Sequence, residues 1–219
     1  MKTRAIWLGA IEIILLGIFI WGFFAIATSF NGPEIHKFDY NIISIVQSNI
    51  SDRLTSIMLF ITFFGSVKGV AIITALVIIA LFITRHRLLS LFLMVTIGLG
   101  AGVFNKILKL YFKRERPDIQ PIIQEHGYSF PSGHSMGSMI LYGSLAFILF
   151  KVFNHTWAKI VGAIFGIVMI FAIGISRIYL GVHYPSDVVG GYIAGAFWLL
   201  ICIITFSFVE KWKKKGLKS

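Results

Sequence analysis

The segment SRIYLGVHYPSD, residues 176–187, decides the fold because its polar and charged side chains separate two long apolar runs. These runs, Trp157–Arg177 and Asp187–Val209, each approach the ~20 apolar residues that cross about 30 Å of hydrocarbon. Within a bilayer a chain satisfies its backbone polar groups by forming a helix. The segment therefore predicts two transmembrane helices joined by a short polar turn.

The rest of the chain has the same character. Hydrophobic residues make up 57% of the 219 residues and charged residues 13%, and the mean hydropathy is +0.86. A soluble core does not need so much apolar surface, so the bilayer is the expected solvent. Four more runs have membrane length: Ala5–Ser29, Val67–Thr84, Leu88–Leu108 and His134–Phe153. We predict one all-α integral-membrane domain over residues 1–219, a bundle of six transmembrane helices.

One apolar run does not fit a single crossing. Residues 54–84 would form a helix of about 46 Å, which is too long for an untilted span. The sequence GSVKG at 65–69 interrupts this run. We therefore predict that Ser51–Phe64 forms a short helix along the outer membrane interface, and that the second span begins near Ser66.

The basic residues indicate the orientation and exclude one class of partner. The net charge is +11, but the cations lie between apolar spans and at both chain ends, which is not the solvated basic face of a nucleic-acid binder. The tail KWKKK, residues 211–215, is the strongest basic cluster, so we predict that both termini are cytoplasmic. The first apolar run is longer than the core of a signal peptide, and we expect it to be retained as a helix.

Three polar motifs then fall on the extracytoplasmic side of the membrane. They are Lys109-x6-Arg116-Pro117, Pro131-Ser132-Gly133-His134 and Ser176-Arg177-x5-His183-x3-Asp187. Each lies at the end of an apolar run. Their convergence on one face predicts an active site at the extracytoplasmic interface.

His183 and Asp187 could form a nucleophilic pair. Pro185 suits the first position of a helix, so Asp187 falls in the first turn, where the helix dipole favours a carboxylate. From there its side chain can turn back to the imidazole, fix the tautomer and leave one nitrogen with a free lone pair. The alternative is a capping aspartate beside an interfacial histidine without chemistry.

The second motif could bind an anion at a helix start. Ser132 is a good N-cap, Gly133 lets an anion approach the backbone, and the first N–H groups of the helix point toward it. His134 would stand beside that anion as a general acid. The alternative is an ordinary serine-capped helix.

The motifs also contain three basic residues. Burial of Lys109, Arg116 and Arg177 near a membrane with few acids is costly unless an anionic ligand binds there. Arginine matches phosphate oxygens with paired hydrogen bonds, and the positive charge would stabilise a phosphoryl-transfer transition state. The other basic residues of this region are expected to contact lipid headgroups: Lys106, Lys113 and Arg114.

The three motifs resemble those of the type 2 phosphatidic acid phosphatase (PAP2) family, with all eleven specified positions present in order. The resemblance implies that His183 is the nucleophile and forms a phosphohistidine, that Asp187 orients it, and that His134 protonates the leaving group. It also implies a set of residues that bind the phosphoryl oxygens: Lys109, Arg116, Ser132, Gly133 and Arg177. No metal and no cofactor are implied.

The resemblance implies a lipid phosphatase whose partners are the bilayer and a phosphorylated lipid. Hydrolysis of phosphatidylglycerophosphate to phosphatidylglycerol is the first expectation. Undecaprenyl diphosphate hydrolysis, which recycles the cell-wall lipid carrier, is the alternative. A transporter that binds phosphorylated lipids without hydrolysis and a catalytically silent scaffold are the rivals from other classes.

Two further features concern packing and the long loop. The glycines at 98, 100 and 102 are expected to permit close helix packing. The loop Lys109–Pro131 is long, and loops of this length are commonly functional. It holds a group that could touch a substrate headgroup: Glu125, His126 and Tyr128.

Overall fold

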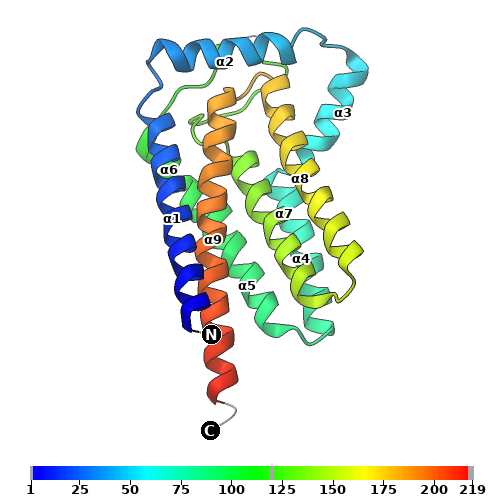
Figure 1. Ribbon diagram of the computed structural model, residues 1–219. Helices are drawn as coiled ribbons and strands as arrows, with labels where there is room; N and C mark the ends of the chain where they lie inside the picture. The colour runs from blue at the N-terminus through cyan, green and yellow to red at the C-terminus, as the bar shows by residue number, and fades with distance from the viewer. Residues whose placement is uncertain (1, 119–120, 217–219) are drawn as a thin grey trace.

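The computed structural model describes residues 2–118 and 121–216, and within these it contains helices and no strands (Figure 1). The helices up to the long loop are α1 (Lys2–Ala27), α2 (Pro33–Val46), α3 (Asp52–Phe63), α4 (Val67–Ile83), α5 (Arg87–Ile97), the π-helix η1 (Gly98–Phe104) and α6 (Asn105–Phe112). After the loop follow α7 (Gly133–Val152), α8 (Thr156–Tyr179) and α9 (Pro185–Gly216).

The bundle is built around α7. This helix packs against α8 and α9, and also against α4, α5 and η1, and its side chains Met136, Ile140 and Leu141 are fully buried. Helix α1 covers the other side of α9 (Figure 1). The surrounding helices expose many large apolar side chains, as expected for helices that contact lipid.

The spans agree with the predicted six-helix bundle. Within the described residues, five helical stretches are long and apolar enough to cross a membrane: α1, the continuous α5–η1–α6, α7, α8 and α9. Helices α3 and α4 form a sixth span if this pair, bent by 49°, is counted as one. The chain is therefore a multi-pass, all-helical membrane protein.

The interfacial helix differs from the prediction. A helix does form at Asp52–Phe63, with Ser51 accepting a hydrogen bond from Leu54 N as its cap (3.4 Å). However, it slopes beside α8 toward α4, whereas α2, which the sequence did not predict, lies across the end of the bundle (Figure 1). Helix α2 is amphipathic, with Asp39 and Ile43 buried on its inner face.

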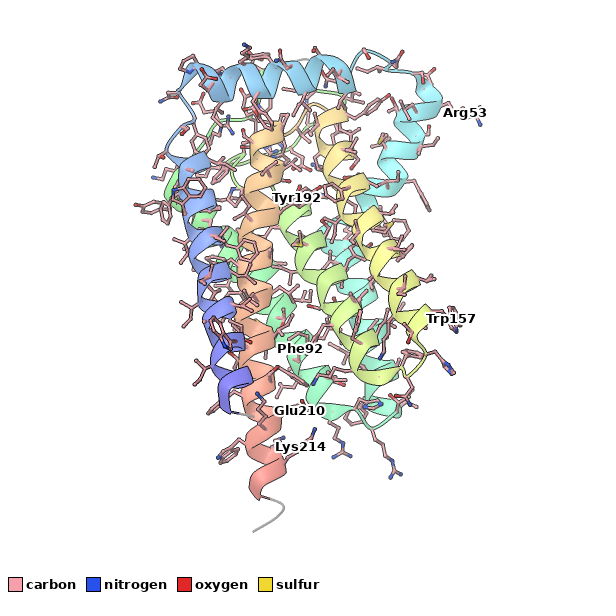
Figure 2. All side chains as sticks on the ribbon, in the orientation of Figure 1. Arg53, Phe92, Trp157, Tyr192, Glu210 and Lys214 are labelled. Atoms are coloured by element: carbon pink, nitrogen blue, oxygen red, sulfur yellow. The ribbon has the colours of Figure 1, made fainter. Side chains whose placement is uncertain are left out.

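The polar motifs and the two chain termini lie at opposite ends of the bundle. Figure 1 shows α2 across one end and both termini at the other, and Figure 2 shows Glu210 and Lys214 at the terminal end. The long loop returns to the α2 end, where Ile122 N donates to Leu180 O (3.1 Å) and Ser129 N donates to Arg114 O (2.8 Å). All three polar motifs consequently lie at the end away from the termini.

The glycine prediction is right for one residue and wrong for two. A Cβ at Gly100 would collide with the ring of Trp198, so this glycine does permit close packing of η1 on α9. At Gly98 and Gly102 a Cβ would meet no atom within 4 Å. These two positions therefore need another explanation.

We predict that Gly100→Ala destabilises the bundle. Trp198 cannot easily retreat, because its Nε1 donates to Thr96 O at 2.9 Å, and overpacking typically costs about 1–3 kcal/mol. Thermal unfolding in detergent should show a lower midpoint than the wild type. Gly9→Ala is the matched control, since a Cβ there meets no atom within 4 Å; equal midpoints for both variants would contradict the prediction.

Candidate active site

The three motifs surround one pocket of about 450 Å³ at the α2 end of the bundle. Three of the motif residues come from helix ends: Lys109 from the last turn of α6, His134 from the first turn of α7, and Arg177 from the last turn of α8. Arg116 comes from the long loop and His183 from the α8–α9 turn. The pocket is lined by Lys109, Arg116, Gly133, His134 and His183.

His183 is held by a carboxylate and a hydroxyl. Its Nδ1 lies 3.5 Å from Asp187 Oδ2 and 3.3 Å from Ser129 Oγ. Ser129 also donates to Asp187 Oδ2, and Tyr184 N donates to the same oxygen at 2.9 Å. Sequence reasoning missed Ser129, since it lies outside the motifs and meets Asp187 only in the folded chain.

The opposite ring nitrogen of His183 faces the pocket. Its Nε2 lies 3.3 Å from Arg116 Nη1. A guanidinium can only donate hydrogen bonds, so Nε2 is the acceptor and the proton resides on Nδ1. This tautomer leaves on Nε2 the lone pair that a nucleophile requires, and here that lone pair accepts the hydrogen bond from Arg116.

Burial keeps the His183 ring neutral. The side chain is 1% exposed, and this desolvation lowers its pKa to about 4, although Asp187 acts in the opposite direction. At neutral pH the imidazole is therefore uncharged.

Arg114 is a buried structural residue, and the expectation that it contacts lipid headgroups is wrong. Its side chain is 8% exposed and bridges two buried carboxylates, with Nη1 2.6 Å from Asp187 Oδ1 and Nη2 3.0 Å from Asp39 Oδ2. The guanidinium lies between the rings of Phe30 and Tyr184, at 4.3 and 4.2 Å. Lys106 and Lys113 are exposed.

Asp39 connects helix α2 to the catalytic turn. Its carboxylate accepts from Ser186 N at 2.8 Å and from Ser186 Oγ at 2.7 Å, in addition to the contact with Arg114. Ser186 directly precedes Asp187. Docking of α2 thus fixes the first turn of α9.

Glu125 pairs with the guanidinium groups of Arg116 and Arg177, which the sequence analysis predicted to bind phosphate. Its Oε1 accepts from Arg177 Nη2, and its Oε2 lies 3.2 Å from Arg116 Nη2. Burial alone would raise the pKa of Glu125, but the charge of Arg177, with smaller effects from other cations, outweighs burial and lowers it. The carboxylate is consequently ionised and bridges two cations.

Arg177 is 1% exposed and is held mainly by this internal anion. Its Nη1 donates to Thr62 Oγ1 at 2.8 Å, and its Nε has no hydrogen-bond partner among the described residues. Arg177 does not line the pocket itself and reaches it through Glu125.

The remaining predicted residues fall into two groups. Lys109 Nζ donates to Tyr128 O at 2.5 Å at the edge of the pocket. The buried hydroxyl of Ser132 accepts from Ser135 N and Ser135 Oγ, at 3.4 and 2.9 Å, so it caps α7 and does not line the pocket. Its backbone N–H donates to Asp187 O at 3.0 Å and ties α7 to α9.

The chain is similar in sequence to known proteins. Residues 87–211 match the profile of the PAP2 superfamily. The chain is 34% identical over 163 residues to phosphatidylglycerophosphatase B of Bacillus subtilis, an alignment covering 74% of this chain and 78% of the relative. It is 29% identical over 182 residues to undecaprenyl-diphosphatase BcrC of the same organism, covering 78% and 84%.

A solved structure has the same fold. The crystal structure of a transmembrane PAP2 type phosphatidylglycerolphosphate phosphatase from Bacillus subtilis superposes with a TM-score of 0.82 at 28% sequence identity. The superposition covers 90% of this chain and 96% of that chain. The similarity therefore extends over most of both chains.

We predict that Arg114→Leu destabilises the protein by about 3–5 kcal/mol, the usual cost of leaving buried charges unpaired. Loss of the guanidinium leaves the buried carboxylates of Asp39 and Asp187 without their shared cation. Thermal unfolding in detergent measures the effect, with the exposed Lys106→Leu as control. Adding Asp39→Asn to Arg114→Leu removes one of the unpaired charges and should restore part of the stability. Purely additive changes in the free energy of unfolding for the double variant would contradict the coupling.

Proposed function

Because the chain belongs to the PAP2 superfamily of lipid phosphatases, we propose that its substrate is phosphatidylglycerophosphate, which it hydrolyses to phosphatidylglycerol. The observation that carries the proposal is the neutral His183, whose Nε2 faces a cation-lined pocket. The similarity to phosphatidylglycerophosphatase B, which extends over most of both chains, supports the choice of lipid.

In the first step, the terminal phosphate of the lipid binds in the pocket. Its oxygens replace the Glu125 carboxylate on Arg116 and Arg177, and Lys109 and the N–H groups at the start of α7 add further donors. Nε2 of His183 then attacks phosphorus. The P–N bond forms while the ester P–O bond breaks, and His134 donates a proton to the departing glycerol oxygen.

In the second step, water hydrolyses the phosphohistidine. His134, now deprotonated, accepts a proton from the water, the P–N bond breaks, and inorganic phosphate leaves. Asp187 and Ser129 hold the Nδ1 proton throughout, so the ring keeps one orientation. The positive charges of Lys109, Arg116 and Arg177 stabilise the negative charge that spreads over the equatorial oxygens.

The site is proposed to face the extracytoplasmic side of the cell membrane. It lies at the end of the bundle away from both termini (Figure 1). The basic tail at residues 211–215 favours cytoplasmic termini. Substrate would then come from the outer leaflet.

Undecaprenyl diphosphate is the second candidate substrate. The 29% identity to undecaprenyl-diphosphatase BcrC, over 84% of that relative, favours it specifically. The same steps would apply, with undecaprenyl phosphate in place of the glycerol alkoxide as the leaving group. Rates for the two lipids, measured on one purified preparation, decide between them.

We predict that His183→Ala abolishes phosphate release from phosphatidylglycerophosphate, a loss of at least about 10³-fold, because a covalent nucleophile cannot be bypassed. His134→Asn should lose about 10²–10⁴-fold, the usual contribution of a general acid. Activity of the wild type should survive EDTA, since three side-chain cations supply the charge neutralisation. Normal turnover by His183→Ala would refute the mechanism.

A substrate with a good leaving group separates the two histidines. Nitrophenolate departs without protonation, so His134→Asn should still release one equivalent of p-nitrophenol from p-nitrophenyl phosphate and accumulate a phosphohistidine. His183→Ala should show neither. A phosphoenzyme in His183→Ala, or none in His134→Asn, would contradict the assigned roles.

We predict that the ring of His183 titrates near pH 4. Its pKa lies below the value of about 6.5 for an unfolded histidine. Between these values the unfolded chain binds a proton that the folded chain does not, so this residue's contribution to stability falls as the pH drops through that window. NMR of ¹³C-labelled histidine, assigned with His183→Asn, measures the titration; a midpoint near 6.5 would contradict the burial argument.

A further inference from the structure

We propose that the protein has a second lipid site, at the end of the bundle that holds the termini, and that this site binds an anionic phospholipid of the surrounding membrane. The phosphate of this lipid lies among basic side chains at the α4–α5 turn, and one acyl chain lies in a groove between α5 and α9. The site is separate from the catalytic pocket, and its ligand is bound without being hydrolysed. The inference therefore holds whichever lipid the enzyme cleaves.

The groove is an apolar cavity of about 290 Å³ between two helices. One wall comes from α5 and the start of η1, from Leu88 to Leu99, and the other comes from α9, from Trp198 to Val209. The two helices run in opposite directions, because Trp198 Nε1 donates to Thr96 O at 2.9 Å whereas Phe206, further along α9, contacts the earlier Phe92 ring at 5.3 Å. Residue 88 thus faces the residues nearest the C-terminus.

The length of the groove matches one leaflet of a bilayer. Each wall covers eleven helical steps, from 88 to 99 and from 198 to 209, which is about 16 Å at 1.5 Å per residue. This is about half of the ~30 Å hydrocarbon core. The groove begins at the second residue of α5 and ends near the middle of the span Arg87–Phe112. An acyl chain that starts at this end of the bundle therefore fits along it.

Basic side chains surround the mouth of the groove. A polar cavity of about 250 Å³ adjoins the groove there, and the two cavities share Leu88 and Phe206. Three cations and one carboxylate line this polar cavity: Arg85, Arg87, Lys151 and Glu210. The Nζ of Lys151 lies over the ring of Phe206, 5.4 Å from its centroid. The cations and the apolar groove thus meet at one side chain.

The positive charge at the mouth exceeds the negative charge that the protein places there. Glu210 pairs with Lys151 at 2.7 Å and with Lys214 at 3.5 Å. Among the described residues, Arg85 and Arg87 have no acid within ion-pair distance. Helix α5 begins at Arg87, so the positive end of its dipole lies at the same place. A phosphodiester complements two such guanidinium groups.

Arg85 has a backbone conformation that favours glycine. Its φ is +62°. His86 N donates to Leu81 O at 2.8 Å and Arg85 N donates to Phe82 O at 3.1 Å, which is the Schellman arrangement at the end of α4, and its left-handed position is usually a glycine. An arginine in this position costs the folded protein stability. A binding role for the guanidinium gives a reason for that cost.

An anionic phospholipid is the ligand that satisfies both parts of the site. Free phosphate would fill the basic cavity and leave the groove empty, and an uncharged lipid would leave the two arginines unpaired. Basic pockets between membrane helices on the cytoplasmic side bind anionic headgroups. Figure 1 shows the α4–α5 turn at the end that holds the termini, and the basic tail at residues 211–215 favours the cytoplasmic side for this end. The lipid would then come from the inner leaflet.

Trp198, at the inner end of the groove, can report the bound acyl chain. The other four tryptophans are 67–74% exposed, so replacement by phenylalanine leaves Trp198 as the single tryptophan: Trp7, Trp21, Trp157 and Trp212. In detergent, phosphatidylglycerol with brominated acyl chains should quench the fluorescence of Trp198 to saturation at low mole fraction. Phosphatidylcholine with the same brominated chains has no net charge and should need about tenfold more, the effect expected from two arginines beside one phosphate.

Two double variants with the same change in net charge test the position of the site. Arg85→Gln with Arg87→Gln should raise the half-saturating amount of brominated phosphatidylglycerol about tenfold and remove the preference over phosphatidylcholine. Lys211→Gln with Lys213→Gln removes two exposed cations that do not line the cavity and should keep the preference. A preference that survives in the Arg85 and Arg87 variant would overturn the proposal, because a lipid in the catalytic pocket does not contact these arginines.

Arg85→Gly separates a binding role of this arginine from a structural one. Glycine relieves the left-handed backbone, so the thermal midpoint without lipid should equal or exceed that of the wild type. The increase in midpoint on addition of phosphatidylglycerol should be smaller than in the wild type, because the variant binds the lipid more weakly. An increase equal to that of the wild type would overturn the assignment of Arg85 to the site.

Inorganic phosphate tests whether the groove contributes. It has the charge of the headgroup and no acyl chain, so at equal concentration it should leave the quenching of Trp198 by brominated phosphatidylglycerol unchanged. Relief of the quenching would mean that the cations bind anions without help from the groove, and this result would overturn the lipid site. None of these measurements depends on hydrolysis, so their outcomes are independent of the proposed function.

Discussion

The buried carboxylate of Asp187 is the interaction on which the rest of the site depends. One oxygen accepts from Ser129 and Tyr184 N, and the other accepts from Arg114. Through these partners the carboxylate joins the long loop to the α8–α9 turn, while Arg114 and Asp39 bring in α2. An unpaired charge in this position would cost several kcal/mol. The orientation of His183 is thus a property of the assembled end of the bundle.

The sequence predicted the features that local patterns encode. Apolar runs of membrane length identified the spans, and motif spacing placed His183 four residues before Asp187 on a proline-initiated turn. It did not predict α2, because this helix is only 14 residues long and buries an aspartate. The roles of Arg114 and Ser129 depend on contacts with residues 75 and 58 positions away in the chain, and no local pattern reports such contacts.

The glycines of η1 also show what local sequence can and cannot predict. A run at 98, 100 and 102 has the spacing of a packing motif, yet a single member contacts a neighbouring helix and the other two face open space. Spacing alone cannot separate these cases, because a glycine is equally suited to close contact and to an unobstructed surface. The distinction requires knowing which elements approach η1 and which diverge from it.

The position of Glu125 has a consequence for turnover. Inorganic phosphate has the same anionic oxygens as the phosphate of the substrate, so cations that bind one also bind the other. The Glu125 carboxylate lies against two of these cations, Arg116 and Arg177. It competes with the product at high effective concentration because it is attached to the same chain. A carboxylate that returns to the two guanidinium groups would therefore favour release of inorganic phosphate.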